Sequence, residues 1–188
     1  MESRIPLLSK EVARQRADAN GVPEYMTRLS IFRVLLHQPE LARVINDLLG
    51  VILFNSQLDT RLRELIIMRL GWSTNSVYEW TQHWKIATSL NVSADDLLGV
   101  RDWKTYRGFG PAEHAVMSAV DETLECGEVS ENTWDALREF VSSDPSTLLE
   151  LVTAIGAWSM VSGLLKSLCI PLEEGVSPWP PDGEGPVR

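Results

Sequence analysis

Three residues with ionisable or hydroxyl side chains, Ser76, Glu79 and His83, are spaced by three and four positions. On a helix this spacing stacks their side chains on one face. Glu64 lies on the preceding predicted helix and approaches His83 if the short turn over 71–75 makes the two helices antiparallel neighbours. An imidazole held by a carboxylate, with a second carboxylate one turn away, can transfer protons near neutral pH. His83, Glu64 and Glu79 are therefore the candidate catalytic residues.

Each of these residues also has a structural interpretation. Ser76 followed by Glu79 fits a capping box, in which both side chains bond the first N–H groups of a helix. His83 fits a hydrogen-bonded structural histidine, and Glu64 fits a surface partner of Arg61. Spacing alone leaves both interpretations open.

Aromatic residues flank the same face. Ser76, Tyr78 and Trp80 are the candidate substrate-binding residues, because they lie beside the proposed acid and base. Large aromatic side chains at such positions also pack in a core or a subunit interface, and this second role is open for Tyr78, Trp80 and Trp84.

Helical periodicity dominates the chain, and no alternating run long enough for a sheet is present, so we predict an all-α fold. Asp59, Ser93 and Ser130 are predicted helix caps, and Gly71 is predicted to end a helix. The predicted helices cover 25–36, 39–54, 61–70, 76–90, 93–98, 111–126, 130–141 and a last, most apolar segment that ends before Pro171.

The predicted organisation has three parts: a polar N-terminal arm (1–24), a helical domain (25–172) and a tail (173–188) rich in proline and glycine. The tail cannot hold a regular helix. We expect it either to be disordered or to lie on a partner subunit.

Composition restricts the class of partner. Apolar residues make up 44% and charged residues 23% of 188 residues, as in ordinary soluble proteins. The net charge of −9 opposes binding to nucleic acid or to an anionic membrane surface. The longest uncharged stretch, 151–165, is shorter than the roughly 20 residues of a membrane span, and the N-terminus lacks a signal-peptide pattern. We expect a cytoplasmic protein with a small-molecule substrate.

The cysteines and histidines do not form a recognised metal or redox motif. Cys126 and Cys169 fit neither a CxxC pair nor a zinc site, and His37, His83 and His114 share no ligand spacing. We therefore expect no metal and no cofactor.

The segments Leu58 to Arg69 and Tyr78 to Ala87 resemble the carboxymuconolactone decarboxylase family, whose superfamily includes alkyl hydroperoxidase D-like proteins. The family pattern is L-x-x-R-x-R-E on one helix, then Y-E-W-x-x-H and a small residue four positions later. Weaker similarity extends over most of 25–170. The resemblance implies an alkyl hydroperoxidase D-like helical bundle that assembles as a homotrimer or homohexamer, with the site near a subunit boundary.

The peroxidase branch of this superfamily is similar to E-x11-C-x-x-C-x-x-x-H. Counted from Glu64, the two cysteine positions fall on Ser76 and Glu79, and the histidine falls on His83. Peroxide reduction of this kind needs a thiolate and a resolving thiol. The sequence therefore predicts a member without the peroxidase motif.

The resemblance carries over Glu64 and His83, the positions common to both branches. It implies a lyase or isomerase that removes CO2 from a small unsaturated lactone acid, with an enolate that an imidazolium stabilises and protonates. Glu79 is then a second acid or base, or a ligand of a substrate hydroxyl. A charged Glu79 would repel an anionic substrate, so a neutral or polycyclic substrate is the expectation. A thiol peroxidase and a non-catalytic oligomeric scaffold are the alternatives.

Overall fold

A computed structural model of the chain describes residues 3–187, and the described residues form helices and loops without strands. They divide into two compact units, 3–55 with 163–176 and 56–162 with 177–187. The all-α prediction is confirmed. The boundaries predicted at residues 24 and 172 stay predictions.

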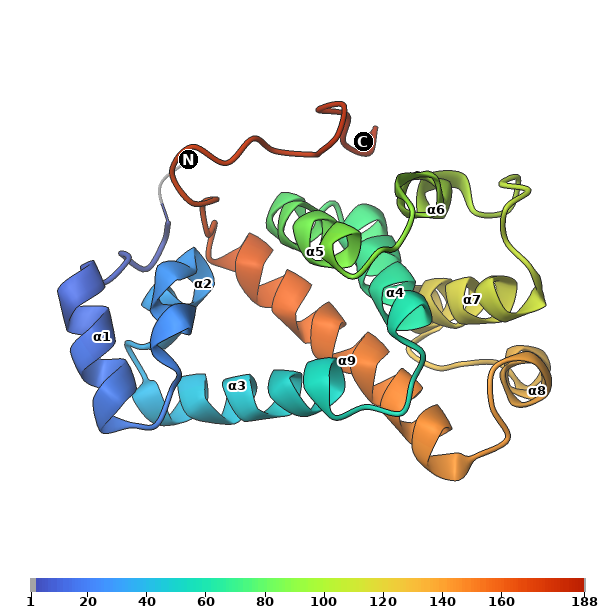
Figure 1. Cartoon of the computed structure of the whole chain (residues 1–188), viewed down its shortest axis with the longest axis horizontal. Coiled ribbons are helices and arrows are strands. Elements are labelled where there is room, and N and C mark those ends of the chain that lie inside the picture. The colour runs from blue at the N-terminus through green and yellow to red at the C-terminus, as the bar shows by residue number, and fades with distance from the viewer. Residues whose placement is uncertain (1–2, 188) are drawn as a thin grey trace. The chain divides into compact units, whose positions relative to one another are not determined.

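The first unit contains α1 (Lys10–Ala19), the 3-10 helix η1 (Glu24–Arg28), α2 (Ser30–Leu35) and α3 (Pro39–Phe54) (Figure 1). Helix α1 is a departure from the predicted polar arm. Its N-terminus is capped by Ser9, whose side chain accepts a hydrogen bond from the Val12 backbone. The single helix predicted over 25–36 is instead broken between η1 and α2.

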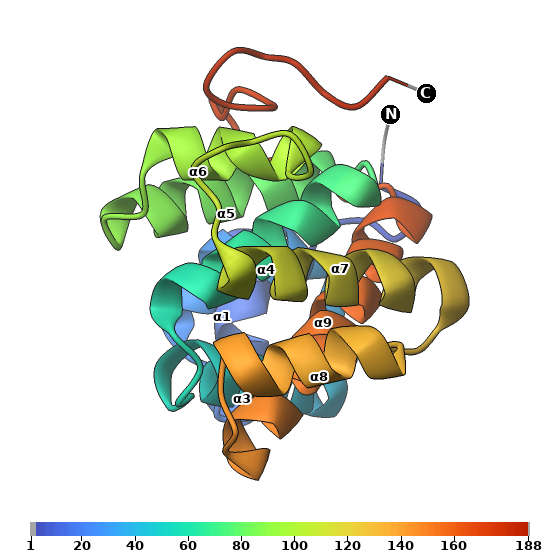
Figure 2. The same cartoon turned by 90° about the vertical axis from the view of Figure 1, so that its right-hand side faces the viewer.

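The second unit contains α4 (Thr60–Ser73), α5 (Val77–Ser89), α6 (Ala94–Gly99) and the 3-10 helix η2 (Val100–Asp102). These are followed by α7 (Pro111–Cys126) and α8 (Glu131–Phe140), which pack side by side (Figure 2). The predicted caps are confirmed, since Asp59, Ser93 and Ser130 each accept a hydrogen bond from the backbone of their helix.

Helices α4 and α5 of the second unit pack against each other extensively. The prediction that Gly71 ends α4 is wrong, because α4 continues to Ser73 and the left-handed residue after it is Asn75, with φ of 54°. Gly71 instead lets the two helices approach. A Cβ atom on it would lie 3.1 Å from the backbone nitrogen of Trp80.

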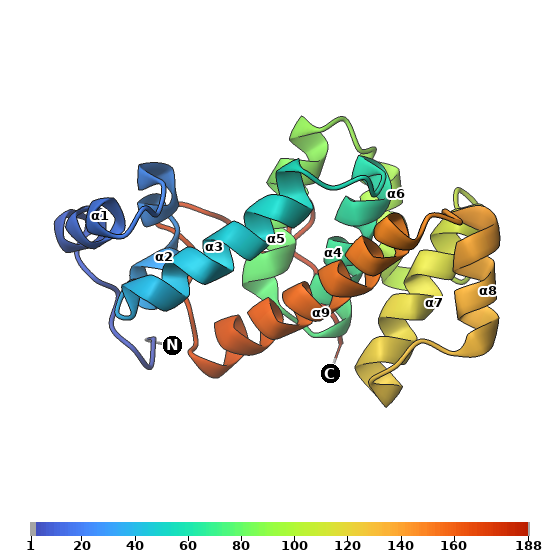
Figure 3. The ribbon, with the colours of Figure 1, turned by 90° about the horizontal axis from the view of Figure 1, so that it is seen from below.

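Helix α9 (Pro145–Ser167) is one continuous rod that contributes to both units (Figure 3). Within the described residues it is the one helix long and apolar enough to cross a membrane by length and composition alone. Half of its most apolar window is buried in the protein, which is also typical of a core helix in a soluble protein.

Candidate active site

The predicted approach of Glu64 to His83 is present across the α4–α5 pair. His83 Nδ1 lies 2.9 Å from Glu64 Oε2. Glu64 is fully buried and His83 is 8% exposed. The surface pairing of Glu64 with Arg61 is wrong, because Arg61 instead binds Asp96 and Glu113. A buried carboxylate on Nδ1 fixes the orientation of the imidazole ring.

Arg63 is a second partner of Glu64 that the sequence analysis did not single out. Its Nε and Nη2 atoms lie 3.2 and 3.1 Å from Glu64 Oε1, so the carboxylate is bonded on both oxygens. Burial opposes ionisation of Glu64, but the charges and hydrogen bonds of His83 and Arg63 outweigh it and lower the pKa of Glu64. Glu64 is therefore ionised at neutral pH.

The other ring nitrogen of His83 is held by helix α9. The indole Nε1 of Trp158 donates a hydrogen bond to His83 Nε2 at 3.1 Å. An indole N–H is only a donor, so Nε2 must accept and Nδ1 must carry the proton that His83 donates to Glu64. The two hydrogen bonds therefore fix the ring orientation and favour the tautomer with its proton on Nδ1.

Glu79 lies one helical turn before His83 and is buried, at 2% exposure. The Ser162 hydroxyl, on α9, donates a hydrogen bond to Glu79 Oε2 at 2.6 Å. Burial raises the pKa of Glu79 to about 8, and the Ser162 hydrogen bond only partly opposes this. Glu79 is therefore mostly a neutral carboxylic acid at pH 7, able to donate a proton.

The capping box predicted for Ser76 and Glu79 is not formed. Ser76 occupies the N-cap position of α5, but its side chain makes no capping hydrogen bond. Ser76 Oγ and Glu79 Oε1 are both buried and have no hydrogen-bond partner within residues 3–187. Buried polar atoms without partners are uncommon in folded proteins. The described chain therefore leaves hydrogen-bonding capacity unused at Ser76 and Glu79.

The two partners on α9 match the two functional residues on α5. Ser162 and Trp158 are four residues apart, as are Glu79 and His83, and the pairs meet in antiparallel order. The sequence pattern predicted only an apolar helical segment here and singled out neither residue. The available signal was a tryptophan and a serine at helical spacing inside the most apolar helix.

Tyr78 and Trp80 are 5% and 0% exposed, and the aromatic neighbours of Trp80 are Trp72, Trp84 and Trp179. These contacts are those of packed side chains. The substrate-binding role predicted for Ser76, Tyr78 and Trp80 stays a prediction.

The remaining cysteines and histidines lie outside this cluster. Cys126 ends α7 and is exposed, and Cys169 follows α9. The ring of His114 contacts Trp103, and His37 Nε2 lies 2.8 Å from the Pro6 carbonyl oxygen. Within the described part of the chain, no group of three or more His, Cys, Asp or Glu side chains could hold a metal ion.

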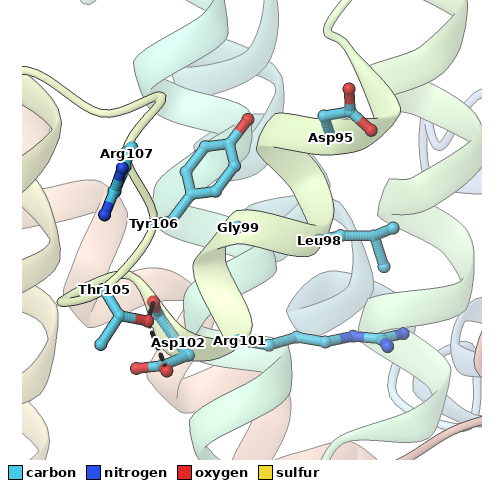
Figure 4. A pocket seen from close by; sticks show the side chains of 8 residues that line it. All are labelled: Asp95, Leu98, Gly99, Arg101, Asp102, Thr105, Tyr106 and Arg107. Atoms are coloured by element: carbon cyan, nitrogen blue, oxygen red, sulfur yellow. Dashed lines mark hydrogen bonds between the residues drawn. The ribbon is translucent and has the colours of Figure 1, made fainter.

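An open cavity of about 590 Å³ lies on α6, η2 and the following loop (Figure 4). The ring of Tyr106 lies against Gly99 and Gly108, where a Cβ atom would be 2.4 Å and 2.6 Å from its atoms. Its hydroxyl donates to Asp96 at 3.1 Å. This cavity is lined by none of the proposed catalytic residues.

Residues 39–122 match the carboxymuconolactone decarboxylase family. This region of the chain is therefore similar to that family. It contains Glu64, Glu79 and His83, but not Trp158 or Ser162 on α9. The comparison with curated proteins gave no significant match.

Solved structures share the fold at low identity. An uncharacterised peroxidase-related protein from Ralstonia eutropha, with an alkylhydroperoxidase AhpD core, superposes with a TM-score of 0.73 at 16% identity, over 93% of this chain and 94% of the other. The debrominase Bmp8, as a cysteine-to-alanine variant in complex with 2,3,4-tribromopyrrole, superposes with a TM-score of 0.72 at 16% sequence identity. The match covers 93% of this chain and 94% of the other. A protein of unknown function from Agrobacterium tumefaciens, whose description names the antioxidant defence protein AhpD, superposes with a TM-score of 0.66 at 19% sequence identity. The match covers 74% of this chain and 96% of the other. The chain thus has the AhpD-like fold.

Proposed function

We propose that this family member is a small-molecule lyase or isomerase that works by proton transfer without a cofactor or a catalytic thiol. The observation that carries the proposal is the pairing of an imidazole held in one orientation, His83, with a buried neutral acid, Glu79, one turn away. Groups that hold and release a proton near pH 7 are what general acid–base catalysis requires.

The role proposed for Glu64 is to position His83. An ionised carboxylate on Nδ1 stabilises the imidazolium that forms when Nε2 takes a proton. Trp158 occupies Nε2 in this structure, so substrate must take the place of the indole hydrogen bond before His83 can act. Glu64 and Trp158 together keep the ring in one orientation.

The role proposed for Glu79 is that of a protonated acid. In a decarboxylation, the bond between the substrate carboxylate and its α-carbon breaks, CO2 leaves, and the electron pair moves into a neighbouring carbonyl as an enolate. His83 first takes a proton from solvent at Nε2 and becomes the imidazolium. Glu79 and Ser76 donate hydrogen bonds to the enolate oxygen, and the imidazolium gives its proton to the α-carbon. No electron acceptor is needed, and the proton that His83 gives is replaced from solvent.

The neutral state of Glu79 bears on the substrate. A charged Glu79 would repel an anionic acid, and this favoured a neutral substrate in the sequence analysis. Because the pKa of Glu79 is raised to about 8, that repulsion is largely absent at pH 7. Small lactone acids and β-keto acids therefore fall within the proposed substrate class, along with neutral carbonyl compounds.

A thiol peroxidase is the second candidate, since two proteins with this fold are described as peroxidase-related. Ser76 and Glu79 occupy the positions of the motif cysteines, and neither can form a disulfide. A non-catalytic scaffold is the third. The hydrogen bond from Trp158 to His83 favours it, because it occupies the nitrogen that would act as the base.

A panel of small lactone acids and β-keto acids, followed by CO2 release and ring isomerisation with a peroxide assay in parallel, tests these candidates. The proposal expects turnover that survives replacement of Cys126 and Cys169 by serine and is lost in His83→Asn and Glu79→Gln. Full turnover by a folded His83→Asn variant would contradict it. Peroxide turnover that the serine variants lose would support the thiol candidate instead.

The implied homotrimer or homohexamer is also a proposal. Helix α3 presents apolar side chains that are at least a third exposed and recur at helical spacing: Leu41, Val44, Leu48, Val51 and Phe54. A second copy of the chain is the occupant proposed for this stripe, because large exposed apolar patches mark protein interfaces. A monomeric mass by light scattering, unchanged in Leu48→Glu, would contradict it.

A further inference from the structure

The C-terminal segment 177–187 lies on its own chain, against α4 and α5 of the second unit (Figure 1, red). The expectation that the tail is disordered or lies on a partner subunit is therefore wrong for this segment. The centroid of the Trp179 ring lies 5.9 Å from the centroid of the Trp72 ring and 6.0 Å from that of the Trp80 ring. Its backbone N–H donates to Thr81 Oγ1, and the Pro180 carbonyl accepts from Trp80 Nε1 at 2.8 Å.

Arg101 completes the surface that the segment covers. Its guanidinium lies over the rings of Trp72 and Trp80, at 4.7 and 5.0 Å, and donates two hydrogen bonds to Asp182 at 2.7 and 3.0 Å. Arg101 Nε is buried and has no hydrogen-bond partner in the described chain. We name this surface the tryptophan–arginine groove, which consists of Trp72, Trp80 and Arg101.

The present occupant shows which chemistry the groove accepts. The segment supplies an indole from Trp179 and a carboxylate from Asp182, three residues later. The groove meets the indole with aromatic rings and the carboxylate with a bidentate arginine, the geometry in which arginine binds carboxylates best. Two donors, Trp80 Nε1 and Arg101 Nε, are available to a different occupant once the segment leaves.

Space adjoins the groove beneath the same segment. A cavity of about 370 Å³ is bordered by Trp72 and Arg101 together with Pro186 from the segment. Volumes of about 300–1,000 Å³ are typical of small-molecule pockets. The segment therefore covers the groove without filling the space next to it.

We propose that the tryptophan–arginine groove is a binding site for a small aromatic carboxylate, and that the C-terminal segment is its tethered competitor. The site is distinct from the proton-transfer cluster, because Trp80 points about 100° around α5 from Glu79 and the partners of the two residues differ. A segment held by one partly exposed ion pair, one indole ring and a few hydrogen bonds exchanges more easily than a core element. Its covalent attachment gives it a high effective concentration over the groove.

Isothermal titration calorimetry with indole-3-acetate tests the proposal on the full-length chain. The double variant Trp179→Ala, Asp182→Asn removes both groups with which the segment occupies the groove. We expect it to bind indole-3-acetate at least about tenfold more tightly than the unmodified chain, because the competitor is gone. Addition of Arg101→Met to the double variant should abolish this gain.

Two controls separate the parts of the proposal. Glu184→Gln removes a nearby exposed carboxylate of the same segment and should bind like the unmodified chain. Indole and acetate, given separately, should bind more weakly than indole-3-acetate. Asp182→Asn alone retains Trp179 and should give an intermediate affinity, which keeps the test valid if the double variant does not fold.

Equal affinity of the unmodified chain and the folded double variant would overturn the proposal, as would absence of binding to both. Binding that Arg101→Met leaves unchanged would also overturn it. These titrations involve no turnover, so their failure leaves the proton-transfer proposal unaffected, and loss of that proposal leaves the groove unaffected.

Discussion

Trp158 donates its indole N–H to His83 Nε2 at 3.1 Å, while Glu64 holds the opposite nitrogen of the same ring. The basic lone pair of the imidazole is therefore covered in this structure. His83 is thus an oriented base whose Nε2 is bonded to the Trp158 indole until another hydrogen-bonding group replaces that indole. This relationship separates the site from an exposed surface histidine.

Replacement of Trp158 by phenylalanine should expose His83 Nε2 to electrophiles. We expect diethyl pyrocarbonate to modify His83 about fivefold faster in Trp158→Phe, since one hydrogen bond of roughly 1 kcal/mol no longer protects the nitrogen. Peptide mass mapping over time measures the rate, and His37 and His114 in the same sample are internal references. If the rate of His83 modification is the same in Trp158→Phe and in the wild-type chain, the hydrogen bond from Trp158 does not protect His83.

Glu79→Gln should change how stability depends on pH. The pKa of Glu79 is raised from 4.5 to about 8, so the folded chain holds a proton that the unfolded chain loses above pH 4.5. This proton adds to the free energy of unfolding fully below pH 4.5, and the added stability is lost as the pH rises to 8. The whole pKa shift corresponds to roughly 4–5 kcal/mol. Urea unfolding should show the wild-type chain losing stability relative to Glu79→Gln between about pH 5 and 8.

The matched control for that experiment is Glu184→Gln, which removes an exposed carboxylate. Its stability difference from the wild-type chain should stay flat over the same range, because the side chain of Glu184 is exposed to solvent in the folded chain. A Glu79→Gln curve parallel to that of Glu184→Gln would show that Glu79 is not held neutral.

Glu64→Gln should destabilise the chain strongly near neutral pH. It leaves Arg63 charged and buried without its carboxylate, and breaking a buried pair in this way costs about 3–5 kcal/mol. The pKa of Glu64 is lowered below 4.5, so its contribution is present above that pH and is lost as pH falls through the folded value. Chemical unfolding at pH 7 and below about pH 4 measures both effects.

Glu139→Gln, on the exposed surface of α8, provides the comparison for Glu64→Gln. Its effect at pH 7 should stay within about 0.5 kcal/mol, which is usual for surface substitutions. If Glu64→Gln behaves in the same way, the buried network is not contributing to stability.

Gly71→Ala should destabilise the chain although alanine favours helix. Its Cβ atom would lie 3.1 Å from the Trp80 backbone, so α4 and α5 must separate, at a typical cost of about 1–3 kcal/mol for overpacking. A Cβ atom at Gly50 in α3 meets nothing within 4 Å, so Gly50→Ala should stabilise the chain by up to about 1 kcal/mol. Thermal unfolding of both variants checks the opposite signs.

Local sequence rules predicted the helices and the α4–α5 half of the site well. Capping side chains and apolar spacing act within a few residues, so Asp59, Ser93 and Ser130 were correctly identified, and spacing brought Glu64 to His83. Gly71 was misassigned because the contact that it permits comes from another helix.

The remaining half of the site depends on contacts across long sequence distances. Trp158 and Ser162 lie 75 and 83 residues from their partners, and nothing in the local pattern of α9 indicates which residues they meet. The position of the tail was missed for the same reason. Its Asp182 finds Arg101 across 81 residues, and a segment without periodicity carries no signal for its packing surface.

The most direct measurement is the titration of Glu79 by carbon NMR on protein labelled at the glutamate carboxyl groups. The account predicts one carboxyl resonance that titrates near pH 8 in the wild-type chain and is missing in Glu79→Gln. Titration of every glutamate below about pH 6 would contradict it, because the site would then lack its neutral acid.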